Sequence, residues 1–178
     1  MKWFLIALGI LAGCAALVVV VGALLPRAHV VSRTLRVRRT PAHVWTLITD
    51  VAAFPVWRSG VTHVEPLPDR NGRPAWIEHG STGDIPLETI DAQAPQRLVL
   101  RVADPTLPFG GTWTYVIAPT NDPSTGAGSE LTITEDGFVS NVIFRFMSRL
   151  VFGHHATIDV YLKNVAAKFG ERAALSGE

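Results

Sequence analysis

The chain begins with an apolar run that few environments can accommodate. From Trp3 to Leu25 (WFLIALGILAGCAALVVVVGALL) there is no charged residue and no proline. A helix over these 23 residues, rising about 1.5 Å per residue, is roughly 34 Å long, enough to cross a hydrocarbon layer of about 30 Å. The sequence therefore predicts an N-terminal transmembrane helix within residues 1–27.

The charges on either side of this run indicate its orientation. Only Lys2 and the amino terminus precede it, whereas five arginines lie within the fourteen residues that follow Leu25: Arg27, Arg33, Arg36, Arg38 and Arg39. Positive charge flanking a transmembrane segment is retained on the cytoplasmic side. We therefore expect a single-pass anchor with the C-terminal domain in the cytoplasm.

Two other interpretations of the run were weighed. A cleaved signal peptide has a shorter apolar region followed by polar sequence, whereas this run continues to Pro26. The segment Leu11-Ala12-Gly13-Cys14 resembles the lipobox of bacterial lipoproteins, in which lipid attached to the cysteine anchors the mature protein outside the cytoplasm. Eleven apolar residues after Cys14 favour the transmembrane helix, and a lipoprotein anchored at Cys14 is the alternative.

The remainder, residues 28–175, has the size of one domain. The whole chain carries 16 basic and 15 acidic residues, and all the acidic ones follow Pro26, so this domain has no basic excess. A nucleic-acid partner is not expected, because such a surface needs a basic face. Cys14 is the only cysteine, which excludes an internal disulfide and a CxxC site.

Hydrophobic periodicity predicts the order of the elements. Alternation or turn signals indicate seven strands, at 29–39, 61–67, 75–80, 85–92, 97–102, 112–118 and 129–136. Two short helices are expected over 40–50 and 51–58, the first capped by Thr40 with Pro41 at its first position. A 3.6-residue period over 141–174 predicts a long final helix, which Gly153 kinks or divides.

This order indicates an α+β protein with short connections and therefore antiparallel strands. The segment TPAHVWTLITDVAAFPVWRSGVTHVE resembles the opening of the START-like, or SRPBCC, superfamily, and it is most similar to the polyketide cyclase/dehydrase and lipid transport branch. Its matching positions are Pro41, Val44, Trp45, Ile48, Asp50, Pro55 and Trp57. The segments APQRLVLRV and ITEDG resemble later strands of that family.

The resemblance implies a helix-grip fold (β-α-α-β6-α), in which a seven-stranded curved antiparallel sheet surrounds the long C-terminal helix. It also implies an internal cavity that binds a hydrophobic small molecule such as a lipid, a quinone or a polyketide. Candidate ligand-binding residues follow from strand alternation and from lining positions: Trp57, Trp76, Glu78, Trp113, Tyr115, Glu135, Arg33 and Arg145.

Glu135 is distinctive because its strand places a carboxylate on the same face as Leu131 and Ile133. A buried charge must be paired or neutralised, and Arg33 and Arg145 are the candidate partners. Glu135 is then either a ligand anchor or general base, or a member of a salt bridge or hydrogen-bonded pair near the end of a strand.

No metal or other cofactor is expected. His154 and His155 are adjacent, so a helix points their side chains about 100° apart, and there is no HExxH motif. His154 is interpreted as a core histidine.

The sequence thus favours a membrane-anchored module that binds a hydrophobic ligand without catalysis. The alternative is a cyclase or dehydratase-like enzyme in which Glu135 or Glu78, helped by Tyr115 or an arginine, moves protons. A structural or regulatory interaction domain with a filled core is a third possibility. An interior without an accessible cavity of about 300 Å³ or more would refute both pocket hypotheses.

Overall fold

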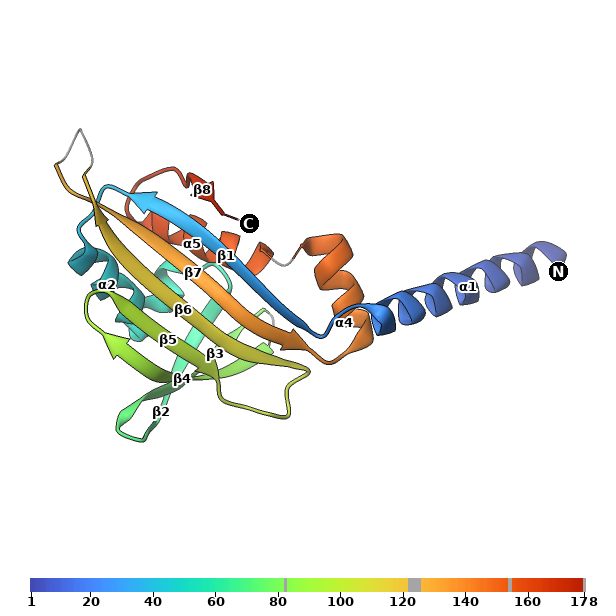
Figure 1. Cartoon of the computed structure of the whole chain (residues 1–178). Helices are drawn as coiled ribbons and strands as arrows, with labels where there is room; N and C mark the ends of the chain where they lie inside the picture. Colours follow the sequence, from blue (N-terminus) through green and yellow to red (C-terminus); the bar gives the residue numbers. More distant parts are fainter. Residues whose placement is uncertain (82, 122–125, 154, 178) are drawn as a thin grey trace.

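A single helix projects from a domain of strands and helices in the computed structural model, which describes residues 1–81, 83–121, 126–153 and 155–177 (Figure 1). The helical elements are α1 (Lys2–Leu24), α2 (Pro41–Thr49), the 3-10 turn η1 (Val51–Ala53), α3 (Phe54–Trp57), α4 (Val142–Met147), the π-helical segment η2 (Ser148–Phe152) and α5 (Ala156–Lys168). The strands are β1 (Ala28–Val37), β2 (Val61–Arg70), β3 (Arg73–Gly80), β4 (Gly83–Gln93), β5 (Arg97–Val102), β6 (Phe109–Thr120), β7 (Gly128–Val139) and β8 (Leu175–Ser176).

Helix α1 extends away from the domain along most of its length (Figure 1). It has 23 residues, and none of its most apolar stretch is buried. The backbone leaves the helix at Leu25, which is extended and precedes Pro26. This helix is long and apolar enough to cross a membrane, a property that it shares with signal sequences.

The strands form one antiparallel sheet in the order β2-β3-β4-β5-β6-β7-β1-β8. Alternation predicted seven strands, whereas the sheet has eight in the part of the chain that the structure describes. The additional strand, β8, pairs with β1 through Thr34↔Ser176 and Leu35↔Leu175. The predicted final helix extended to residue 174, directly before β8. Helix α5 instead ends at Lys168, and Gly170 follows it with a positive φ of 73°.

The long C-terminal helix is divided as expected. Gly153 has a positive φ of 77°, which no helix accommodates, and it separates η2 from α5. Helix α2 begins at Pro41 as predicted, but the Thr40 side chain does not cap it. The Thr40 hydroxyl instead contacts His43 Nδ1 at 3.0 Å.

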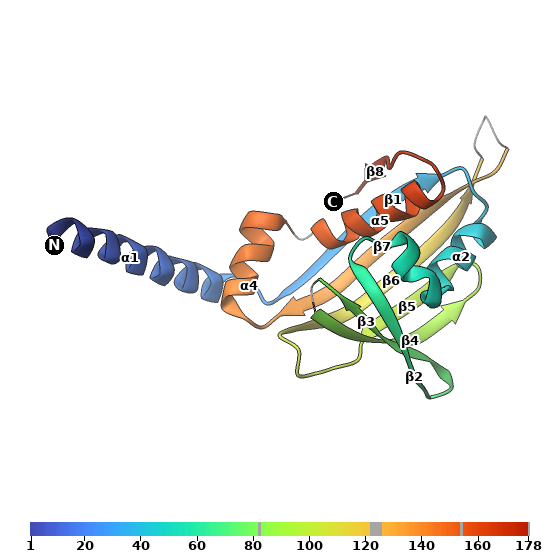
Figure 2. The ribbon, with the colours of Figure 1, turned by 180° about the vertical axis from the view of Figure 1, so that it is seen from behind.

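Helices α2 and α5 cover the same face of the curved sheet (Figure 2). The buried face of α5 contributes Ile158, Leu162 and Val165, each 0 % exposed, to the core. From the sheet, Leu35 and Ile133 are equally buried in the same cluster. Burial of this helix stripe therefore fixes α5 on the concave side, as a helix-grip fold requires.

We expect Leu162→Ala to lower the free energy of unfolding by about 2–5 kcal/mol, because it removes buried methyl groups and leaves a cavity. Lys163→Ala, at the exposed neighbouring position, is the control and is expected to change stability by less than about 0.5 kcal/mol. Thermal and urea denaturation of both variants measures the difference. Equal stability of the two would contradict the packing of α5 on the sheet.

Candidate functional site

A pocket of about 320 Å³ lies between the first turns of α5 and the ends of β2, β3 and β4. Its apolar wall comes from Val61, Ile85, Trp113, Val160 and Tyr161. Its polar lining includes Arg58, Glu78, His79, Ser81 and Asn164. The pocket opens to the surface at its rim, where Val160 is 48 % exposed.

Arg58 and Glu78 form an ion pair in the pocket wall. Arg58 Nη1 donates to Glu78 Oε1 at 2.5 Å, and the side chains are only 18 % and 9 % exposed. Trp76 Nε1 also donates to this oxygen, at 3.3 Å. Because the two charges compensate one another and the carboxylate has two donors, the pair tolerates its burial.

Tyr161 is the centre of an aromatic cluster behind this pair. Its ring centroid lies 5.6 Å from those of Trp57 and Tyr115 and 6.1 Å from that of Trp113. The Arg58 guanidinium carbon lies 4.9 Å from the Tyr161 centroid, in the range of a cation–π contact. The cluster therefore holds the cation in place from one side while Glu78 neutralises it.

Burial controls the ionisation of the phenols. It raises the pKa of Tyr115 and Tyr161 well above the ordinary range, although the nearby Arg58 opposes this. Burial alone would lower the pKa of Arg58, but attraction to Glu78, with smaller effects of Tyr161 and Tyr115, raises it. The two tyrosines thus remain hydrogen-bond donors and Arg58 remains a cation at neutral pH.

His79 lies at the pocket rim between two carboxylates. Its Nδ1 is 2.7 Å from Asp84 Oδ1, and its Nε2 is 3.3 Å from Glu65 Oε2. The His63 ring stacks on it at 5.6 Å. The hydrogen bond to Asp84 first, and then that to Glu65, raise the pKa of His79. The rim therefore carries more positive charge at mildly acidic pH than a free histidine would give it.

Two of the candidate ligand-binding residues, Glu78 and Trp113, line the pocket. Trp57, Trp76 and Tyr115 lie behind it, 8 %, 2 % and 4 % exposed, within the core. Trp57 Nε1 is buried and has no hydrogen-bond partner among the described residues. These three side chains support the pocket wall and do not line it.

Glu135 lies on the inner face of β7, as its alternation predicted, but its expected partners do not reach it. His29 Nε2 lies within hydrogen-bond distance of Glu135 Oε1, at 3.3 Å, which matches the paired carboxylate near a strand end that was the alternative to a ligand anchor. Arg33 instead bonds Asp159 at 3.0 Å. Arg145 donates to backbone oxygens of Leu25, Val139 and Ser140. Glu135, Arg33 and Arg145 do not line the pocket.

Arg58 and Tyr161 were not among the candidates. Arg58 directly follows a short helix, where neither period assigns a face to a side chain. Tyr161 belongs to the apolar stripe of the final helix and was interpreted as core. Its phenol could have marked it as a site residue, since a tyrosine on a buried stripe needs a polar partner. His154, interpreted as a core histidine, lies outside the described residues.

No group of three or more His, Cys, Asp or Glu side chains is placed to hold a metal ion within the described part of the chain. The site thus combines an apolar pocket, one compensated ion pair and two protonated phenols.

Several solved structures share this fold. A START superfamily protein from Mycobacterium smegmatis superposes with a TM-score of 0.62 at 15 % identity, covering 79 % of this chain and 96 % of that one. The Zhui aromatase/cyclase from a Streptomyces species gives 0.61 at 14 % identity, covering 79 % and 93 %. Norcoclaurine synthase from Thalictrum flavum gives 0.61 at 12 % identity, covering 82 % and 88 %. At these identities the likeness establishes the fold alone.

The fold and its pocket therefore define a START-like, SRPBCC-type domain. The family described as "Polyketide cyclase / dehydrase and lipid transport" matches residues 28–169. The chain belongs to this family. No curated protein matches it.

The His79 geometry gives a pH prediction. Because its folded-state pKa is raised, protonated His79 contributes stability that is fully present below the unfolded pKa and is lost as pH rises through the folded value. NMR titration is expected to show a lower His79 pKa in Asp84→Asn than in the wild type. Asp69→Asn, which changes an exposed carboxylate six residues along β2 from His63, the residue opposite His79, is the control. A His79 pKa unaltered by Asp84→Asn would contradict the assignment.

Proposed function

We propose that the domain binds a neutral, mainly apolar small molecule in the pocket beside α5, and that α1 anchors the domain to a membrane. The observation that carries the ligand proposal is the pocket itself. Its volume of about 320 Å³ lies at the lower end of the range of small-molecule sites, roughly 300–1,000 Å³. Membership of a family described by polyketide and lipid chemistry supports the same conclusion.

The volume limits how much of the ligand the pocket encloses. A water molecule occupies about 30 Å³, so the pocket holds on the order of ten water-sized groups. One ring or a short chain with a polar substituent fills this space. The open rim beside Val160 allows a longer tail to extend outward.

The charge arrangement favours a neutral polar group on the ligand. Arg58 and Glu78 already neutralise one another at 2.5 Å, so an ionised headgroup would leave one charge uncompensated in a desolvated site. A carbonyl or hydroxyl oxygen accepts from the guanidinium without breaking the ion pair. An uncharged ring or chain that carries such a group fits these constraints.

The same contacts favour binding over proton transfer. Glu78 Oε1 already accepts from Arg58 and Trp76 Nε1, and the raised pKa of Tyr115 and Tyr161 keeps both phenols protonated. A general base needs a free lone pair. A cyclase or dehydratase activity would therefore have to use the other oxygen of Glu78 while Arg58 binds Oε1.

Filling the pocket is expected to remove the ligand. Val160→Trp places an indole at the rim, where the side chain is already 48 % exposed and folding is little affected. Native mass spectrometry of the full-length protein in detergent is expected to show bound organic adducts in the wild type and none in Val160→Trp. Lys163→Trp, on the exposed side of α5, is the control. Equal adducts in all three proteins would refute the proposal.

The role of the Arg58–Glu78 ion pair in ligand binding is tested by comparison with a similarly buried ion pair outside the pocket. Glu78→Gln leaves Arg58 uncompensated and is expected to lower the affinity for the adduct about ten- to hundredfold, the effect of one lost charged hydrogen bond. Glu88→Gln removes a carboxylate of equal burial, 7 % exposed, that pairs with Arg101 at 2.5 Å and does not line the pocket. Equal occupancy in both variants would remove Glu78 from the site.

For the anchor we propose a single-pass α1 with the domain in the cytoplasm. In a Cys14→Ala background, a cysteine at exposed Val116 is expected to react with a membrane-impermeant maleimide only after the cells are lysed. Reaction in intact cells would reverse the orientation. The intact mass of the purified protein decides between the anchors, because lipoprotein processing removes residues 1–13 and adds acyl chains at Cys14.

A further inference from the structure

The segment α4–η2 presents an apolar face that the domain does not cover. Ile143, Phe144, Leu150 and Val151 are 52 %, 57 %, 56 % and 55 % exposed. Ile143 and Leu150 are seven residues apart, as are Phe144 and Val151, and Met147 lies three or four residues from each. This spacing is that of one side of a helix. Several large apolar side chains gathered on one helical face mark an interaction surface.

The opposite face of α4 is fixed to the end of α1. A Cβ atom at Gly22 would lie 2.1 Å from the Val142 carbonyl oxygen, so the two backbones touch there. Arg145 is 4 % exposed, and its guanidinium donates to the carbonyl of Leu25 at 3.0 Å and to that of Ser140 at 2.8 Å. The position of α4 relative to α1 is therefore set by close packing and by a buried arginine.

This attachment fixes the depth of α4 once α1 spans a bilayer. Gly22 precedes Leu25, the last apolar residue of the run, by three residues, which is about 4.5 Å along a helix. Interfacial helices lie about 5–10 Å into the boundary between headgroups and acyl chains. The start of α4 is thus at the depth where such helices are found. The exposed Arg27 and Arg149 suit the anionic headgroups beside it.

We propose that α4–η2 is a second membrane contact, lying in the interfacial layer of the same bilayer that α1 crosses, with Phe144 and its apolar neighbours inserted. This inference depends on the proposed anchoring by α1. The proposal also places the pocket near the lipid. The first turn of α5 lines the pocket and begins soon after η2. This start of α5 lies at the end of the domain from which α1 leaves (Figure 2).

Lipid-quenching of a site-specific fluorophore tests the proposal in the full-length protein. Phe144→Cys and Val116→Cys, each in a Cys14→Ala background, carry an environment-sensitive label in phosphatidylcholine nanodiscs with a nitroxide near the top of one acyl chain. Val116 is 42 % exposed on the outer face of β6 and serves as the control. We expect the Phe144→Cys label to be quenched at least about threefold more than the Val116→Cys label, as insertion to interfacial depth requires.

The wild-type cysteine separates this proposal from the anchoring on which it depends. A label on Cys14, in the middle of α1, is expected to be quenched most by a nitroxide near the end of the acyl chain. Quenching at Cys14 with none at Phe144→Cys would overturn the interfacial contact and leave the anchor intact. If the Phe144→Cys label instead reports an apolar environment without lipid quenching, and copies of the protein crosslink through this face, the face belongs to a dimer. That result would equally overturn the interfacial contact. Near-UV circular dichroism identical to that of the wild type shows that each variant is folded.

Discussion

The packing of α5 against the concave face of the sheet is the interaction on which the remaining structure depends. Ile158, Leu162 and Val165 are fully buried there and fix the helix along its length. At its first turns, Ala156, Thr157 and Val160 face the pocket, and Val160 is 48 % exposed at the rim. The pocket is therefore the corner beside the ends of β2, β3 and β4 that the helix does not fill. Stability and ligand binding thus arise from one arrangement in which the helix fills most, but not all, of the concave face.

Periodicity predicted the order of the elements and the faces of the inner strands, because both are local properties of the chain. Alternation correctly placed Glu135 on the inner face, but it could not identify His29 as its partner. That choice depends on the pairing of β1 with β7, where Glu135 lies opposite Val31, and register between distant strands leaves no local signal. Arg58 escaped prediction for a related reason, since only the tertiary fold brings it to Glu78.

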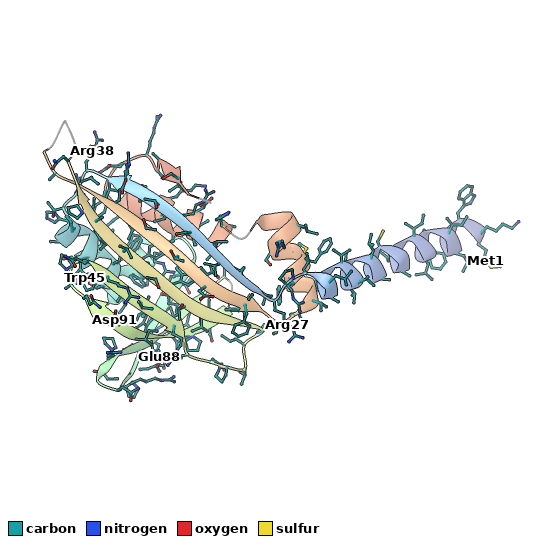
Figure 3. The ribbon with its side chains drawn as sticks, viewed as in Figure 1. Met1, Arg27, Arg38, Trp45, Glu88 and Asp91 are labelled. Atoms are coloured by element: carbon teal, nitrogen blue, oxygen red, sulfur yellow. The ribbon has the colours of Figure 1, made fainter. Side chains whose placement is uncertain are left out.

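Arg27 lies at the end of the domain next to α1, and Arg38 lies at the opposite end (Figure 3). Strand β1 spans roughly 33 Å between them at about 3.3 Å per residue, so most of the arginines counted near the membrane are carried away from it. Arg33, Arg36 and Arg38 pair with acidic residues of the domain. Under the proposed anchoring by α1, they would still bias the orientation, because that bias acts near the transmembrane segment during insertion. Of these arginines, Arg27 directly follows α1 and Pro26.

The position of the pocket bears on ligand exchange as much as its volume does. Each 100 Å² of apolar surface that a ligand exposes to water costs about 2.5 kcal/mol, so release of such a molecule into the aqueous phase is slow. If the pocket lies next to the interfacial layer, as proposed, that exposure is shorter, because the ligand passes from the apolar pocket directly to the nearby acyl chains. The neutral Arg58–Glu78 pair fits the same route, since a neutral ligand enters the bilayer far more readily than a charged one. The proposed anchor, the open rim and the compensated charge would therefore all suit the ligand proposed above, an uncharged and mainly apolar molecule.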